Sequence, residues 1–165
     1  MNKRYLALFM GVTAASFVAA HVRLIYSGNG NVLYWKNPDN ISVVIKSAGS
    51  EDIPDDGHFP AIRNAISAWN EAGGTTAKLV EDKRSSEQAS SNWQSNSRHM
   101  ILFDESNSSG YFPGVSGIVA VTPVTFYTTG SIIDADVLFN GKDYLFTTEG
   151  ILGRFDVQDL SLIHI

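Results

Sequence analysis

Between positions 59 and 72 the spacing of the hydrophobic residues is that of a helix. The other elements of the chain have to pack around this helix. Apolar side chains recur there every three or four residues, at Phe59, Ile62, Ile66 and Trp69. That spacing is typical of an amphipathic helix with one face in the core. We predict a helix over residues 60–72, with Pro60 in its first turn and Gly73-Gly74 as its exit.

Strand patterns surround this helix. Runs rich in β-branched and other apolar residues, bounded by turn residues, predict strands at 41–45, 76–80, 99–103 and 117–121. Pro123 stops the last of these, which favours the edge of a sheet because proline cannot donate to a ladder. Apolar and polar residues alternate over 133–139, and Asn140-Gly141 then predicts a hairpin with residues 144–146. The fold class is therefore α+β.

Composition and charge exclude several classes of protein. The chain has 165 residues, 44% of them hydrophobic, which suits one domain with a single core, and we expect a monomer. Its net charge is −5 and no basic cluster occurs beyond the first residues, so we expect no nucleic-acid partner. The chain has no cysteine, so the fold depends on its core or on bound metal ions rather than on disulfides.

The first residues have the pattern of a secretory signal peptide. Two basic residues precede an apolar run over 5–18, and Ala19-Ala20 supplies the small residues expected before a cleavage site. A membrane anchor is the alternative, but the run is short and is followed by polar sequence, so we expect no stable anchor. We predict that residues 1–20 are a signal peptide and that the domain over 21–159 is secreted.

A second helix is expected near the end of the chain. Phe155-Asp156-Val157-Gln158-Asp159 places an acidic side chain where it can cap a helix that begins near Asp156. Together with three earlier stretches, in the same order along the chain, it resembles the matrixin-type metzincin zinc metallopeptidases, particularly secreted bacterial members. The matching stretches are 61–69, 117–123, 133–140 and 155–159.

The resemblance implies a fold and a place for the substrate. The fold would be a twisted, mixed, five-stranded sheet backed by helices, as in the N-terminal subdomain of a metzincin. An extended peptide or protein substrate would pair with an edge strand made of Gly117, Ile118, Val119, Ala120 and Val121. The second helix would present zinc ligands at the floor of a cleft.

The resemblance also implies that the chemistry lies beyond Asp159. In the family, the stretch at 155–159 leads into His-Glu-x-x-His-x-x-Gly-x-x-His, in which the histidines hold zinc and the glutamate is the general base. Residues 160–165 are Leu-Ser-Leu-Ile-His-Ile instead. We therefore expect no catalytic residue in the chain as written, and no activity from it.

The histidines that are present do not have the spacing of a zinc site. His21, His58 and His99 are scattered, without the i, i+4 spacing that puts two ligands on one helix face. Ile163 aligns with the first zinc ligand and His164 with the catalytic glutamate, so His164 is out of register. We expect no zinc ligand among these residues.

A pair of acidic residues is a candidate for a different metal. Asp134 and Asp136 are two apart on one predicted strand, close in sequence to Asn140 and Asp143. Oxygen ligands grouped in this way suit calcium. The alternative, which the pattern favours, is that both carboxylates face solvent on a half-exposed strand.

The abrupt loss of the family pattern predicts that residues 160–165 are not native. The codons CTG TCT CTT ATA CAC ATC encode these residues, and that string matches the adapter end of transposase-prepared sequencing libraries. A natural frameshift or a truncated pseudogene is the alternative.

Two functions stay open on the sequence. The first is a secreted zinc-dependent metalloendopeptidase, of which the chain is an N-terminal fragment that lacks the zinc-binding helix. The second is a non-catalytic secreted binding module rich in β-structure. A truncated relative that acts as an inhibitor or decoy is a third, without direct support from the residues.

Overall fold

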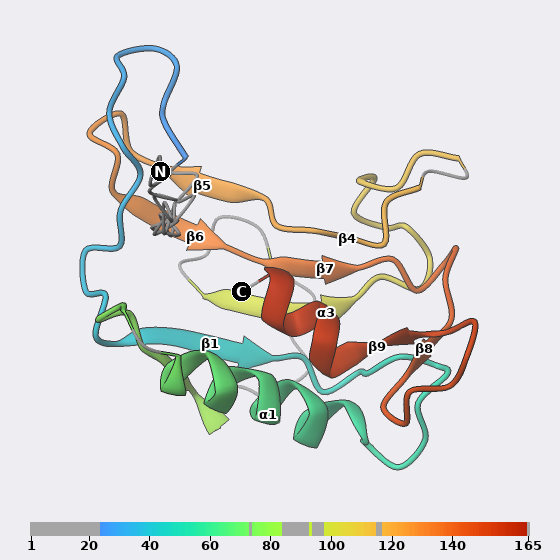
Figure 1. Ribbon diagram of the computed structural model, residues 1–165. Helices are drawn as coiled ribbons and strands as arrows, with labels where there is room; N and C mark the ends of the chain where they lie inside the picture. Colours follow the sequence, from blue (N-terminus) through green and yellow to red (C-terminus); the bar gives the residue numbers. More distant parts are fainter. Residues whose placement is uncertain (1–23, 73, 84–92, 94–97, 115–116, 165) are drawn as a thin grey trace, which may run out of the picture.

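Figure 1 shows the computed structural model of the chain, which describes residues 24–72, 74–83, 93, 98–114 and 117–164. Its centre is a five-stranded mixed sheet in the order β2-β1-β3-β7-β4. The strands span Leu79–Glu81 (β2), Ile41–Ile45 (β1), His99–Phe103 (β3), Val137–Phe139 (β7) and Ala120–Val121 (β4). Neighbouring strands are parallel, except that β4 runs antiparallel to β7. The expected five-stranded mixed sheet is confirmed.

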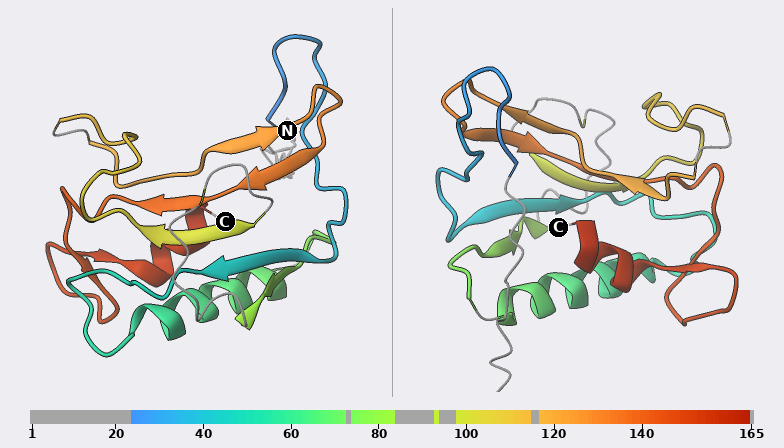
Figure 2. Two further views of the ribbon diagram at one scale, coloured as in Figure 1. Left: turned by 180° about the vertical axis from the view of Figure 1, so that it is seen from behind. Right: turned by 45° about the horizontal axis from the view of Figure 1, so that its top comes forward.

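Two helices of the described chain lie on one side of this sheet (Figure 2). α1 spans His58–Glu71 and buries Ile62 and Ile66, and α3 spans Val157–His164 and packs against α1. α1 begins two residues before the predicted start, with Pro60 in its first turn as predicted. Arg63 of α1 makes two hydrogen bonds to the carboxylate of Glu81, at 2.8 and 2.9 Å, which tie the helix to β2.

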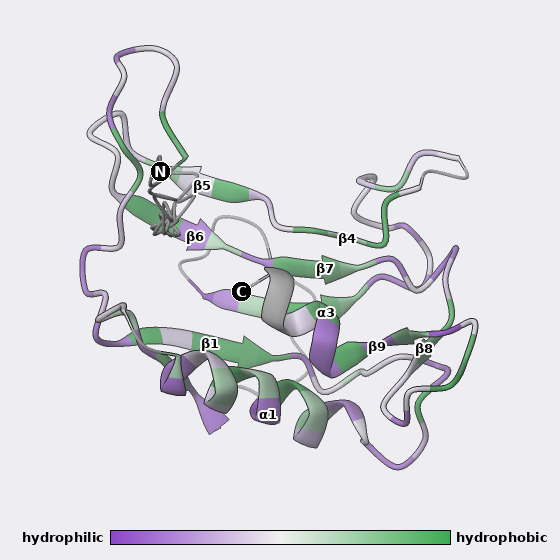
Figure 3. Ribbon diagram, viewed as in Figure 1, coloured by the Kyte–Doolittle hydropathy of each residue, from purple (hydrophilic) through white to green (hydrophobic). Residues whose placement is uncertain are grey.

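The core lies on both sides of the sheet, because successive residues of each central strand point to opposite faces. The larger cluster fills the space between the sheet and the helices, and includes Ile45, Ile62, Ile101, Phe103 and Phe139. On the opposite side the buried residues are Val44, Met100, Leu102, Phe112 and Leu138. In Figure 3 the central strands are mostly coloured as hydrophobic, whereas α1 alternates between the two colours as an amphipathic helix should.

The predicted strand over 133–139 is divided in two at Asp136. Its first part, β6 (Ile132–Ala135), pairs with β5 (Val124–Phe126) in a separate antiparallel sheet, and its second part is β7. Asp136 marks the change from one sheet to the other, and its carboxylate accepts a hydrogen bond from the N–H of Met100 at 2.8 Å. β5 has no counterpart among the predicted strands.

The predicted hairpin after Asn140 is wrong. Neither Asn140 nor Gly141 has the positive φ that a two-residue turn of this kind requires. The N–H of Tyr144 donates to the carbonyl of Asn140, which closes a wider turn. β8 (Phe146–Thr147) then pairs in parallel with β9 (Phe155–Asp156) rather than with β7.

Two other strands differ from their predicted bounds. β2 lies at 79–81 rather than 76–80. Only Ala120 and Val121 of the predicted strand over 117–121 pair with β7. The carbonyls of Ile118 and Val119 accept hydrogen bonds from Asn140 instead, so the chain bends before it enters β4.

The segment before β1 packs along the β5–β6 hairpin. Tyr34 bridges Ser131, and the ring of Tyr26 contacts the ring of Phe126. The predicted signal peptide over 1–20 and His21 lie outside the described residues. Within the described part of the chain, the helices are too short or too polar to cross a membrane.

Candidate functional site

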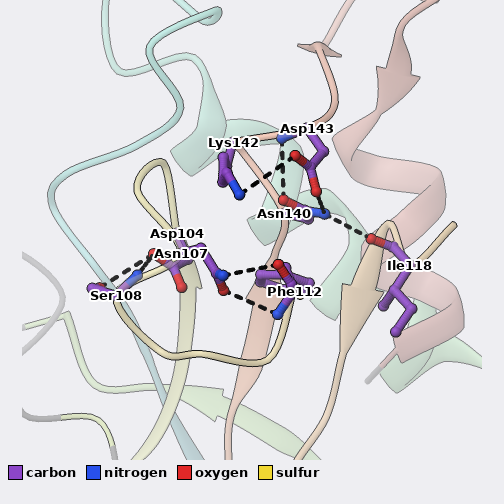
Figure 4. A network of polar contacts seen from close by, with 8 residues as sticks. All are labelled: Asp104, Asn107, Ser108, Phe112, Ile118, Asn140, Lys142 and Asp143. Atoms are coloured by element: carbon purple, nitrogen blue, oxygen red, sulfur yellow. Dashed lines mark hydrogen bonds and ion pairs between the residues drawn. The ribbon is translucent and has the colours of Figure 1, made fainter. Parts of the chain in front are cut away.

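β4 lies at one end of the strand order, so one of its edges faces away from the sheet. The segment that leads into it is held by Asn140, which is fully buried. The Asn140 amide donates to the carbonyl of Ile118 at 2.9 Å and to the carboxylate of Asp143 at 3.0 Å (Figure 4). Its oxygen accepts a hydrogen bond from the N–H of Asp143 at 3.2 Å. One buried side chain therefore fixes the approach to the edge strand.

Replacing Asn140 with alanine should lower the free energy of unfolding by about 2 kcal/mol, because buried backbone groups lose their partners. Urea denaturation measures the change. Asn29→Ala is the matched control, since Asn29 also donates from its amide to a backbone carbonyl, that of Thr128 at 2.8 Å, but is exposed. The control should lose less than about 0.5 kcal/mol. Equal losses in the two variants would contradict the role of Asn140.

A second set of polar contacts shapes the loop between β3 and β4 (Figure 4). The buried carboxylate of Asp104 accepts hydrogen bonds from the N–H groups of Ser108 and Ser109 at 2.9 and 3.0 Å. Burial alone would raise the pKa of Asp104, but the hydrogen bonds from these serines outweigh it and lower the pKa. Asn107, with a left-handed φ of 56°, exchanges two hydrogen bonds with the backbone of Phe112. The loop thereby holds Phe112 against the sheet.

α3 begins where the sequence predicts. The Asp156 carboxylate accepts hydrogen bonds from the N–H groups of Gln158 and Asp159, at 2.9 and 3.3 Å. This is the pattern of a helix N-cap, so the predicted role of Asp156 is confirmed. Val157 is fully buried in the core between the sheet and α1. α3 also contacts β4, so the helix is held by both α1 and the edge strand.

Ser161, on the buried side of α3, does not fit its surroundings. Its side chain is fully buried, and its hydroxyl has no hydrogen-bond partner among the described residues. A buried hydroxyl left unpaired costs about 1–3 kcal/mol. An apolar side chain of similar size would suit this position better.

Asp134 and Asp136 are 1% and 2% exposed, so the interpretation that they face solvent is wrong. Asp134 lies 3.2 Å from Nδ1 of His99. Burial raises the pKa of Asp136 to about 7; the N–H of Met100 opposes this shift and the charge of Asp134 adds to it. The other two residues of the predicted group, Asn140 and Asp143, bond to each other after β7.

Of the histidines that the structure describes with their side chains, His58 is buried and His99 is half-buried. His99 packs edge-on against Trp35, with ring centroids 4.7 Å apart. Burial lowers the pKa of His99, against the opposing influence of Asp134. His58 is 1% exposed at the start of α1. Among the described residues, no three His, Cys, Asp or Glu side chains form a group that could hold a metal, and calcium at Asp134 and Asp136 stays a prediction.

Two of the cavities among the described residues differ in size and in the polarity of their lining. A small apolar cavity of about 40 Å³ is lined by Trp35 and His99 together with residues of the helix-covered face. A cavity of about 430 Å³ lies beside the start of α1, and its charged residues are Asp52, Asp55, Glu149 and Arg154. Residues 117–121 line neither of them.

No protein-family model matches the chain, and no curated protein matches it significantly.

Proposed function

We propose that the chain is the N-terminal part of a secreted, zinc-dependent metalloendopeptidase of the matrixin type. The observation that supports this most is the position of α3. The helix starts at the stretch 155–159, is capped by Asp156, and packs against both α1 and β4. A second helix that begins there and reaches the edge strand is what the resemblance requires of the helix that carries the zinc ligands.

The proposed substrate is an extended segment of a peptide or protein, bound along residues 117–121. β4 is the last strand of the sheet and the one antiparallel member. An extended peptide that adds to such an edge gains affinity from backbone hydrogen bonds and specificity from its side chains. Asn140 would hold Ile118 and Val119 in place for this contact, which makes it a positioning residue in the proposal.

The residues present do not fit a zinc ion. His58 is buried against the ring of Phe59, His99 packs against Trp35, and no group of three ligands occurs among the described residues. In the proposed intact protein the ligands and the general base follow Asp159, so no catalytic step is assigned to this chain. The unpaired hydroxyl of Ser161 supports the accompanying proposal that residues 160–165 are not native.

The first test is to sequence the source DNA through the codon for Asp159 with long reads that need no transposase library. The proposal expects a frame that continues into His-Glu-x-x-His-x-x-Gly-x-x-His. The protein made from that frame should cleave an unfolded protein substrate, lose this activity when a chelator is added and regain it with zinc. Glutamine in place of the motif glutamate is the matched inactive control. An unrelated continuation, or the same six residues followed by a stop, would contradict the proposal.

A non-catalytic secreted binding module is the second candidate function. The same feature favours it, because an edge strand can pair with an extended partner without any metal. If residues 160–165 and a stop are encoded in the genome, the chain should retain extended peptides without cleaving them. Mass spectrometry of the peptides after incubation distinguishes retention from cleavage.

A further inference from the structure

The imidazole of His58, the first residue of α1, is sealed inside the protein. The residue is 1% exposed, and neither Nδ1 nor Nε2 has a hydrogen-bond partner among the described residues. Most buried polar side-chain atoms in proteins are hydrogen-bonded, because an unpaired one loses its interaction with water and gains nothing. Burial of the His58 imidazole with both nitrogens unpaired therefore lowers the stability of the folded protein.

Three segments close around this ring. The ring of Phe59 in α1 lies 4.3 Å from it, and that of Phe103 at the end of β3 lies 6.3 Å from it, measured between centroids. From the loop after β1, Gly49 comes so close that a Cβ there would stand 2.3 Å from Nδ1. Only a glycine fits this position, and its backbone seals the ring from that side.

The charges around the ring do not compensate for its burial. Burial lowers the pKa of His58. The carbonyl of Lys46 and the charge of Asp56 raise it, and the charge of Arg63 lowers it again. The Lys46 carbonyl raises the pKa only partly against burial, and neither ring nitrogen makes a hydrogen bond among the described residues. The contact from β3 is the uncharged ring of Phe103, so the site favours the neutral imidazole.

The turn just before His58 has an unusual backbone. Asp55 and Asp56 both have left-handed φ values, of 54° and 57°. Single non-glycine residues in this region are uncommon, and two in succession are held there by the surrounding structure rather than by their own preference. A change that frees this turn would let both residues return to ordinary conformations.

We propose that His58 is an acid-sensitive latch, and that protonation of its ring releases residues 46–57 and the first turn of α1 from the sheet. A protonated imidazole has two N–H donors and a charge, but in its present position the ring is sealed from water and neither nitrogen makes a hydrogen bond among the described residues. It reaches water when the loop that carries Gly49 moves outward, and Asp56 then provides a nearby opposite charge. This regulation is independent of the proposed peptidase activity.

The direction of the pH effect follows from proton linkage. In the unfolded or opened state His58 binds a proton near pH 6.5, whereas in the closed state it binds one only at lower pH. The open form therefore holds more protons below about pH 6.5, and acid favours opening. The equilibrium constant for opening should rise up to about ten-fold per pH unit, until the pH falls below the lowered pKa of the closed state.

The effects of two other groups with shifted pKa values, His99 and Asp136, have to be separated from that of His58. The pKa of His99 is also lowered by burial, but His99 has Asp134 as a partner and lies on a different part of the sheet. Asp136 has a raised pKa, so it acts with the opposite sign. His99→Leu and Asp136→Asn are therefore the controls, and both should leave the acid response of residues 46–57 intact.

The experiment is hydrogen exchange of the full chain between pH 5 and 8, corrected for intrinsic exchange, together with an NMR titration of the His58 ring. In the unmodified chain, opening of residues 46–57 should increase up to about ten-fold per pH unit below 6.5, and His58→Leu should abolish this increase. The same acid response in His58→Leu would overturn the proposal. If His58→Leu does not fold, the titration decides: a ring that titrates at or above pH 6.5 while residues 46–57 stay protected also overturns it.

Discussion

Phe139→Ala should reduce the free energy of unfolding by about 3–5 kcal/mol, because it removes a fully buried ring and leaves a cavity. Phe139 lies in β7, and its ring centroid is 4.9 Å from that of Phe103 and 5.7 Å from that of Phe146. These three rings join β3, β7 and β8 beneath the helices. A typical domain has a free energy of unfolding of about 5–15 kcal/mol, so this one substitution would remove a large part of it.

Urea denaturation of Phe139→Ala, followed by fluorescence and circular dichroism, measures this loss. Leu152→Ala is the matched control, since Leu152 is a large apolar residue that is 100% exposed. It should change the free energy of unfolding by less than about 0.5 kcal/mol. A loss below about 1 kcal/mol in Phe139→Ala would mean that the aromatic cluster is not packed as described.

The effect of Asp136→Asn on the free energy of unfolding should be about 2 kcal/mol more stabilising at pH 8 than near pH 4. The reason is that at pH 8 the substitution removes a buried charge. Burial raises the pKa of Asp136 to about 7, so at pH 8 the folded protein holds a carboxylate that burial disfavours. An amide has no charge to desolvate, and its oxygen can still accept the hydrogen bond from Met100. The full shift in the pKa of Asp136 corresponds to a free energy of at most about 4 kcal/mol. Because the surroundings screen the charge, we expect about half of this value.

The sign of this effect is specific to a raised carboxyl pKa. Between about pH 4 and 7, Asp136 is protonated in the folded state and ionised in the unfolded state. Its contribution to stability is therefore present at low pH and is lost as the pH rises through this window. Unfolding by urea at several pH values should show that the substitution removes this component.

Asp104→Asn should have a pH dependence opposite to that of Asp136→Asn, because the pKa of Asp104 is lowered rather than raised. Asp104 is also buried, but hydrogen bonds from Ser108 and Ser109 lower its pKa. Its contribution is present above the unfolded pKa of about 4 and is lost as the pH falls through the lowered folded value. The Asp104→Asn variant should thus be less stable than the unmodified protein at neutral pH. From pH 4 to pH 8 the effect of Asp136→Asn should become more stabilising and that of Asp104→Asn more destabilising; if both effects change in the same direction, the two environments are not as described.

The helix-period and strand-period patterns predicted the elements whose side chains face one continuous core. The strands at 41–45 and 99–103 have the predicted bounds, and α1 differs by two residues at its start. The split at Asp136 could not be predicted in this way, because its carboxylate bonds to Met100, a residue distant in sequence. Local alternation describes one strand well but contains no information on which sheet that strand joins.

The sequence indicates where the candidate site lies, but not which side-chain contacts hold it in place. Pro123 correctly indicated an edge strand, and Asp156 correctly indicated a helix cap. Asn140-Gly141 predicts a hairpin turn, although the spacing between Asn140 and Asp143 also suits a side chain that accepts a hydrogen bond from a following N–H. The burial of Asp134 and Asp136 depends on the distant contacts of β3, so no local pattern could indicate it.

The parallel pairing of the central strands also affects how the chain folds. β1, β3 and β7 are neighbours in the sheet, yet α1 and β2 lie between β1 and β3 in the sequence, and β4, β5 and β6 lie between β3 and β7. Chains dominated by such distant pairings fold slowly, in about milliseconds to seconds, because loop closure precedes any gain from contact. During synthesis on the ribosome, one edge of β3 stays unpaired until β7 has emerged. We therefore expect the nascent chain to depend on chaperones, or on slow translation, over the interval between these two strands.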